Sequence, residues 1–157
     1  YRINPFIGCM HRIMLIGENG VGRRSLVHAL GFAPPAGLCP LAVEYAGPFV
    51  LPPAEFMENR RFYRALITSA MECRILVFVQ DATRATSAFP PGFARTFNQR
   101  VLGLITKPDS PKANTARAGR FLASAGLQTI HTVNILEGAD SAAMQAFAAE
   151  LQLLPNS

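Results

Sequence analysis

The feature that most constrains the fold is a glycine-rich segment between a short apolar run and a candidate helix. In HRIMLIGENGVGRRSLVHAL, residues 13–16 are apolar and Gly17, Gly20 and Gly22 precede the candidate helix 23–30. Four apolar residues suit a buried strand, and the apolar residues that follow have helical spacing. The glycines permit a tight turn, in which backbone N–H groups and a positive helix terminus meet at one point. The segment therefore predicts a strand, a phosphate-cradling loop and a helix.

The side chains of this loop depart from the usual phosphate-binding pattern. That pattern ends in Gly, Lys and then Ser or Thr, whose hydroxyl binds magnesium. Here Gly22 is followed by Arg23 and Arg24, and a hydroxyl appears only at Ser25. We therefore predict no metal site. Two interpretations stay open: the arginines neutralise a phosphate through bidentate hydrogen bonds, or Arg24 turns outward and the loop is only a structural turn.

Length and composition predict one domain with a buried sheet. The chain has 157 residues, of which 50% are hydrophobic and 16% charged. No apolar run approaches the roughly 20 residues that span a bilayer, and no secretory leader is visible, so we expect a cytoplasmic protein without a membrane partner. The cysteines lack metal-type spacing and are interpreted as reduced, structural thiols, and the histidines are too scattered to predict a metal site. They are Cys9, Cys39, Cys73, His11, His28 and His131.

The formal charge of +5 raises the question of a nucleic-acid partner. All but two of the 15 basic residues are arginine, but they are dispersed and no aromatic residues are interleaved with them. Stacking platforms of that kind are typical of single-strand binding. We therefore expect no nucleic-acid partner and interpret most of the charge as solvated surface. Arg60 and Arg61, near the start of a candidate helix, can instead serve an acidic partner.

Apolar runs alternate with helical patterns along the rest of the chain. Strands are expected at 42–45 and 49–51, joined as a hairpin, and at 75–79, 101–105 and 129–133. Helices are expected at 59–73, at 114–125, and after a cap at Asp140 or Ser141. This alternation predicts an α/β fold with a mostly parallel sheet and helices on both faces. The expected organisation is an arm over 1–10, one domain over 11–154, and a tail over 155–157.

Several dispersed motifs occur together in this order. They are AVEY at 42–45, EFMENRRFYRALI at 55–67, VQDAT at 79–83, FPPGFA at 89–94 and TKPD at 106–109. With these motifs the chain resembles the EutP/PduV family of small GTPase-like proteins, associated with ethanolamine- and propanediol-utilisation bacterial microcompartments. The resemblance implies a three-layer P-loop NTPase fold of the small-GTPase type.

Transferred position by position, the resemblance indicates a loss of magnesium chemistry. The family's loop resembles GxxGxGKTT, so its lysine and first hydroxyl fall at Arg23 and Arg24. Its switch threonine falls at Pro40, and its DTPGE becomes LPPAE from Leu51. A guanidinium about 4 Å from a divalent cation would cost on the order of 8 kcal/mol at an effective dielectric of 20. Magnesium-dependent hydrolysis is therefore not expected, and no residue is assigned a catalytic role.

The base-reading motif, by contrast, is intact. Thr106, Lys107 and Asp109 match the family's TKxD, in which the lysine packs along guanine and the aspartate accepts hydrogen bonds from it. The Ser-Ala pair that helps to hold guanine falls near Asn134 and Ile135. The resemblance thus leaves GTP, GDP or a phosphate-like anion, bound without magnesium, as the ligands to consider.

Two functions follow from the resemblance. The favoured one is a pseudo-GTPase adaptor that associates with microcompartment shell or enzyme proteins and whose switch is frozen by Pro40, Pro52 and Pro53. The expected docking surfaces are the segment 89–93 and the arm with Phe6 and Ile7. The alternative is an active nucleotide enzyme: a weak GTPase or ATPase, or an acetate-kinase-like phosphotransferase.

Two acidic residues near these motifs allow more than one interpretation. Asp81 follows a buried run, so it is either the acidic strand-end residue of an ATPase or, as we favour, a cap for the next turn. Glu55 follows two prolines and is expected to form a salt bridge.

Overall fold

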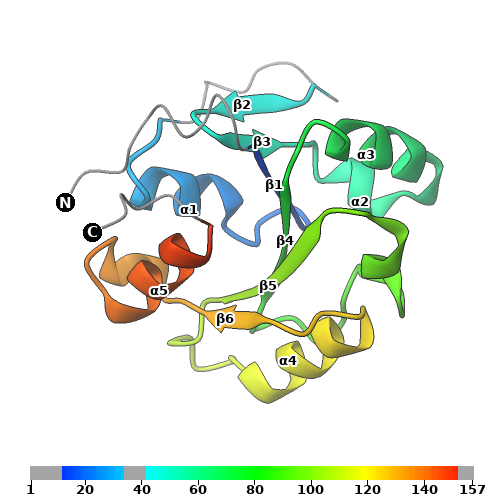
Figure 1. The fold of residues 1–157 in the computed structure, drawn as a ribbon. Helices are drawn as coiled ribbons and strands as arrows, with labels where there is room; N and C mark the ends of the chain where they lie inside the picture. Colours follow the sequence, from blue (N-terminus) through cyan, green and yellow to red (C-terminus); the bar gives the residue numbers. More distant parts are fainter. Residues whose placement is uncertain (1–11, 34–41, 152–157) are drawn as a thin grey trace.

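The computed structural model describes residues 12–33 and 42–151, which form one six-stranded sheet with helices on both faces (Figure 1). The strands are β1 Ile13–Ile16, β2 Glu44–Ala46, β3 Phe49–Leu51, β4 Ile75–Asp81, β5 Arg100–Thr106 and β6 Ile130–Thr132. The α-helices are α1 Arg23–Ala29, α2 Glu55–Glu58, α3 Tyr63–Ala70, α4 Thr115–Ser124 and α5 Ala142–Glu150. The 3-10 turns are η2 Arg60–Phe62, η3 Phe93–Thr96 and η4 Ile135–Glu137. Expectations for the arm, Cys9, Cys39, His11, Pro40 and the tail lie outside the described residues.

The sheet has the order β2-β3-β1-β4-β5-β6. β2 and β3 form the expected antiparallel hairpin, and every other neighbouring pair is parallel. Gly47 lies in the hairpin turn with φ +56°, a conformation that glycine adopts without strain. Because the other strands are parallel, their carboxyl ends meet at one edge of the sheet, which places the segments after β1, β4 and β5 together.

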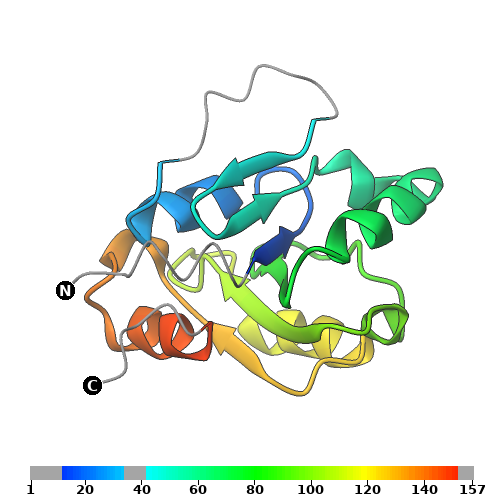
Figure 2. The same ribbon diagram turned by 45° about the horizontal axis from the view of Figure 1, so that its top comes forward.

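Side chains of β1 alternate between two apolar cores. Ile13 and Leu15 pack with α1 and α5, whereas Met14 and Ile16 pack with α2, α3 and α4. Figures 1 and 2 show the corresponding layers, with α1 and α5 on one side of the sheet and the other helices opposite. All four β1 side chains are buried, as the continuous apolar run predicts for a strand covered on both faces.

Two helix boundaries were decided by side-chain caps. The helix expected over 59–73 starts as the 3-10 turn η2, continues as α3 and ends at Ala70. Asn59 caps its start, since it is extended (φ −124°, ψ 117°) and its side chain accepts from the Arg61 N–H, and it separates η2 from the additional short helix α2. For α5 the choice between two caps falls to Ser141, whose Oγ accepts from the Met144 N–H at 3.2 Å. No helix of the described part of the chain is long and apolar enough to span a bilayer.

The prediction that the aromatic residues of segment 89–93 form an exposed docking surface is wrong. Phe89 and Phe93 are 7% and 6% exposed, and both pack on Phe78 of β4. The Phe89 and Phe78 rings are stacked, with centroids 4.6 Å apart and an interplanar angle of 4°. The two prolines and Gly92 turn the backbone so that both aromatic rings enter the core, which leaves Pro91 as the exposed residue.

Candidate functional site

The glycine-rich loop follows β1 and leads into α1, as the sequence predicts. Gly20 and Gly22 have φ values of +84° and +101°, which side chains rarely adopt. A Cβ on Gly17 would lie 2.9 Å from the Val79 carbonyl oxygen, so the backbones approach too closely for any other residue. Beside the loop is a cavity of about 380 Å³. Its lining residues are Glu18, Asn19, Gly20, Val21, Gly22, Arg23, Arg24, Ser25 and Lys107.

Thr106 and Lys107 hold this loop against the end of β5. The buried Thr106 Oγ1 donates to the Val21 carbonyl at 2.8 Å, and Lys107 Nζ donates to the Gly20 carbonyl at 2.7 Å. Lys107 has φ +58°, an uncommon conformation for a residue other than glycine. Because two polar contacts hold its side chain, the strained backbone is fixed in place. Thr106 and Lys107 of the TKxD motif therefore hold the loop in place through contacts within the protein.

Asp81 is the second partner of Lys107. Its Oδ2 accepts from Lys107 Nζ at 2.9 Å, while its Oδ1 accepts from the N–H and the hydroxyl of Thr83 at 2.8 and 2.6 Å. Burial acts to raise the pKa of Asp81, but the hydrogen bonds from Thr83 and Lys107 outweigh burial and lower it. The interpretation of Asp81 as a turn cap is confirmed, and the cap also anchors the lysine.

Arg23 lies at the position of the family's phosphate-binding lysine, but its guanidinium contacts backbone. Nη1 donates to the carbonyls of Leu15 at 3.1 Å and Pro52 at 2.6 Å. Burial lowers the pKa of Arg23, and the nearby carboxylates of Glu44, Glu55 and Glu58 partly offset this effect. The side chain therefore ties the end of β1 to the segment after β3.

Arg24 and Ser25 follow on the first turn of α1. Arg24 Nη1 forms an ion pair and hydrogen bond with Glu44 Oε2 of β2, and about half of its side chain is exposed. Ser25 is exposed and lines the cavity. The Arg24 side chain is directed to the neighbouring strand β2, as the second interpretation of the loop expects. Ser25 and Lys107 nevertheless line the cavity, so an anion site beside the loop stays open as a prediction.

Two contacts of this loop were not predicted. The Asn19 N–H donates to Glu58 Oε1 of α2 at 3.0 Å, so a carboxylate takes one of the loop's backbone donors. Arg84, after β4, pairs with Glu18 and donates to the Asn19 carbonyl. Both contacts join residues 39 or more positions apart, and no local spacing in the sequence signals them.

The residues at this loop do not fit a magnesium ion of the family's kind. Arg24 stands where the hydroxyl ligand is expected and is paired with Glu44. Leu51, at the position of the family's magnesium-linked aspartate, is 4% exposed within the apolar core. Within 12–33 and 42–151, no group of three or more His, Cys, Asp or Glu side chains could hold a metal. Magnesium requires oxygen ligands, and these positions supply a guanidinium and an aliphatic side chain.

The base side of the site is less complete than the loop. Asp109 is exposed and does not line the cavity. Asn134 caps its own turn by accepting from the Leu136 N–H at 3.1 Å, and Ile135 lies over Gly22, 3.2 Å from where a Cβ would stand. Glu55, expected to form a salt bridge, is exposed and forms none with any described residue.

Comparison with known proteins gives a consistent family. The model of the PduV-EutP family, described as ethanolamine utilisation - propanediol utilisation, matches residues 10–150. The propanediol utilization protein PduV of Citrobacter freundii is 35% identical over 130 residues, which cover 82% of this chain and 86% of that protein. The probable acetate kinase EutP of Escherichia coli is 29% identical over 121 residues, which cover 76% of each chain.

Solved structures support the fold. Era of Aquifex aeolicus, bound to GDP.AlF4-, aligns with a TM-score of 0.53 at 15% identity. Era in complex with MgGDPNP and a segment of 16S ribosomal RNA aligns with a TM-score of 0.55 at 18% identity. The alignments cover 93% and 94% of this chain but only 57% of each Era chain. At these identities the structural similarity shows a P-loop NTPase fold, and no function is inferred from it.

Proposed function

Because this chain belongs to the PduV-EutP family, we propose that it is a pseudo-GTPase that acts as an adaptor of a bacterial microcompartment and does not hydrolyse nucleotide with magnesium. The observation that carries the proposal is the pairing of Arg24 with Glu44. Phosphoryl transfer depends on metal and positioned charge far more than on covalent help from the protein. Here a cation replaces the metal-binding hydroxyl, and its charge is already neutralised within the protein.

The contacts of Arg23 support the same conclusion. A lysine at this position serves phosphate in the general pattern, but the Arg23 guanidinium bridges Leu15 and Pro52. The segment after β3 is therefore held against the loop by the protein itself. A switch that moves with its ligand requires two states of differing ligand affinity, and this bridge favours one of them.

A metal-independent ligand remains part of the proposal. The lining of the cavity beside the loop includes Gly20, Gly22, Ser25 and Lys107, whose ammonium also contacts Asp81 and the Gly20 carbonyl. GDP, GTP or a smaller phosphate-like anion is the proposed ligand class. Binding would then survive EDTA, because no divalent ion contributes to it.

The alternative function is an active nucleotide enzyme. It is favoured by the name of the Escherichia coli relative, a probable acetate kinase, and by the intact bracing of the loop by Thr106 and Lys107. Such an enzyme would transfer a phosphoryl group from ATP to acetate, giving acetyl phosphate and ADP, or would hydrolyse GTP.

Two assays separate these functions. Purified chain is incubated with GTP, or with ATP and acetate, and each reaction is run once with magnesium and once with EDTA. The control is a relative that has lysine and a hydroxyl residue at the positions equivalent to Arg23 and Arg24. We expect turnover only by the relative. Magnesium-dependent turnover by this chain at a comparable rate, abolished in an Arg23→Ala variant that circular dichroism shows to be folded, would establish the alternative. For the adaptor role, tagged chain is used as bait in a microcompartment-forming cell, and failure to recover any shell or lumen protein would count against it.

A further inference from the structure

Ion pairs are distributed unevenly over the described surface. The basic residues that pair with a carboxylate within 4.0 Å are Arg12, Arg24, Arg84, Arg100 and Lys107. They lie on α1, at strand ends, or in loops at the edge of the sheet. A second set of exposed arginines, on η2, α3, η3 and α4, forms no ion pair with any described carboxylate. This set, named the basic face here, comprises Arg60, Arg61, Arg64, Arg95 and Arg120.

The chain itself holds no further carboxylate side chain for these arginines. All ten Asp and Glu residues lie within the described ranges, so residues 1–11, 34–41 and 152–157 contribute none. Of the two carboxylates on α2, Glu58 accepts from the Asn19 N–H, and Glu55 is exposed without an ion pair. A macromolecule that neutralises the basic face must therefore bring its own negative charge.

The arginines of the basic face belong to one layer. α2, α3, η3 and α4 all contribute to the same apolar core, on the side of the sheet opposite α1 and α5 (Figure 1). Tyr63 of α3 contacts Phe93 of η3, with ring centroids 5.1 Å apart. The N–H groups of Gly92 and Ala94 donate to the end of α4 at 2.9 Å each. η3 thus lies between α3 and α4, in the layer from which these arginines project.

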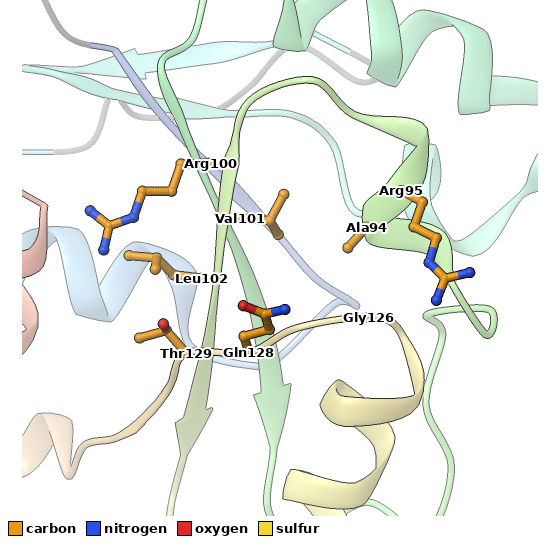
Figure 3. A pocket seen from close by; sticks show the side chains of 8 residues that line it. All are labelled: Ala94, Arg95, Arg100, Val101, Leu102, Gly126, Gln128 and Thr129. Atoms are coloured by element: carbon orange, nitrogen blue, oxygen red, sulfur yellow. The ribbon is translucent and has the colours of Figure 1, made fainter.

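A cavity of about 290 Å³ adjoins this layer, but it does not gather the arginines around a small anion. Arg95 and Arg100 both line it, and Figure 3 shows their guanidinium groups extending to opposite sides of the view. Arg100 pairs with Glu150. Arg95 forms no ion pair with a described carboxylate and extends away from the cavity, which suits contact with a separate macromolecule better than capture of a small ligand.

The side chains around these arginines narrow the class of partner. Aromatic residues of the layer pack on one another, as in Phe56 with Phe62 and Tyr63 with Phe93, and one ring of each pair is buried, which does not resemble a row of open rings for stacked bases. Among the described large apolar residues that are exposed, Met71 lies at the end of α3 and Tyr45 contacts Glu72 beside it, so there is little to insert into lipid. Guanidinium groups, in contrast, suit bidentate pairing with carboxylates.

We infer that the basic face is a docking surface for an acidic protein segment, rich in Asp or Glu. The inference deepens the adaptor role and rests on that proposed function, because it names the chemistry of the partner. It replaces the aromatic segment 89–93, whose rings are buried, as the docking surface. Electrostatic contacts of this kind accelerate association and give specificity, and they weaken as salt rises.

The test compares two double variants that lower the net charge equally. Arg60→Gln with Arg64→Gln removes charge from the basic face, and Arg12→Gln with Arg100→Gln removes it from ion-paired positions elsewhere. The probe is a fluorescein-labelled 16-residue peptide of alternating Glu and Ala, titrated with full-length protein at low and at physiological salt. We expect the first variant to lose about tenfold in affinity and the second less than about twofold, with binding that weakens as salt rises.

Additional titrations and a folding check distinguish an acidic peptide from other anionic partners. The same titrations are run with a 16-nucleotide oligo-dT and with phosphatidylcholine vesicles containing phosphatidylserine, and circular dichroism checks that both variants are folded. Equal loss in both variants would show a general effect of charge and overturn the inference. Absence of peptide binding at low salt would also overturn it, as would tighter binding of DNA or vesicles. These outcomes leave the turnover assays of the proposed function unaffected, so the two can fail separately.

Discussion

The guanidinium of Arg23 donates a hydrogen bond of 2.6 Å to the backbone carbonyl of Pro52, 29 positions along the chain. A residue at the position of a phosphate-binding lysine therefore serves as a structural tie between the loop and the segment after β3. The same Nη1 reaches the Leu15 carbonyl at the end of β1. Arg23 thus links the end of β1, the start of α1 and the segment after β3 through one guanidinium nitrogen.

Replacing Arg23 with alanine is expected to destabilise the ligand-free protein. Two carbonyls lose a charged donor, and hydrogen bonds of this kind contribute about 1.5–3 kcal/mol each to stability, with incomplete additivity. We predict a loss of about 2–4 kcal/mol in the free energy of unfolding, measured by urea denaturation without nucleotide. Arg23→Lys keeps the charge but not the planar fork and should recover only part of the loss. Unchanged or increased stability in Arg23→Ala would mean that the side chain is reserved for a ligand.

Glu58 is expected to compete with anions for the loop. Its carboxylate takes the Asn19 N–H, and a negative charge about 5 Å from a bound phosphate costs on the order of 0.8 kcal/mol even in water. Glu58→Gln should therefore raise the affinity for GDP in EDTA about fourfold or more by calorimetry. Glu55→Gln, on the same helix without that contact, is the matched control. Equal gains in both variants, or no gain in Glu58→Gln, would show that Glu58 does not guard the loop.

Asp81 should make stability depend on pH in the acid range. Its folded-state pKa is lowered relative to the unfolded chain, so the carboxylate stabilises the fold above the unfolded value of about 3.9 and loses this effect as pH falls through the folded value. Asp81→Asn is expected to cost about 1–3 kcal/mol at pH 7. Urea unfolding at pH 7, 5 and 3 should show that the difference from the original chain persists to pH 5 and shrinks toward pH 3. A difference that stays constant at all three values would contradict this account.

Phe89→Ala tests whether the segment 89–93 belongs to the core. Phe89 stacks on Phe78 and is 7% exposed, so its removal should cost about 3–5 kcal/mol. Thermal unfolding followed by circular dichroism would register this loss. Pro91→Ala, at an exposed position two residues away, serves as the control and should change stability by about 0.5 kcal/mol or less. If Phe89→Ala left stability unchanged, the ring would be on the surface, as the sequence first indicated.

Much of the fold could be predicted because its signals are local. The continuous apolar run of β4 identified a strand buried on both faces, and the glycines before α1 identified a turn that needs positive φ values. Caps were harder to place, since Asp140 and Ser141 can both serve, and the choice depends on which oxygen reaches the Met144 N–H. The mostly parallel sheet followed from the alternation of strands and helices, but the strand order β2-β3-β1-β4-β5-β6 is known only from the structure.

In the candidate site, too, local features could be predicted from the sequence and long-range contacts could not. By itself, the sequence determined which chemical groups stand at the loop: two arginines where a lysine and a hydroxyl are expected, and an intact Thr106 and Lys107. Only the tertiary structure decided their partners, because a guanidinium pairs with whichever oxygen lies within reach in three dimensions. Arg23 donates to the Pro52 carbonyl, Arg24 pairs with Glu44, and Glu58 accepts from the Asn19 N–H, 39 positions away. Such pairings depend on long-range geometry and desolvation, which a linear pattern does not contain.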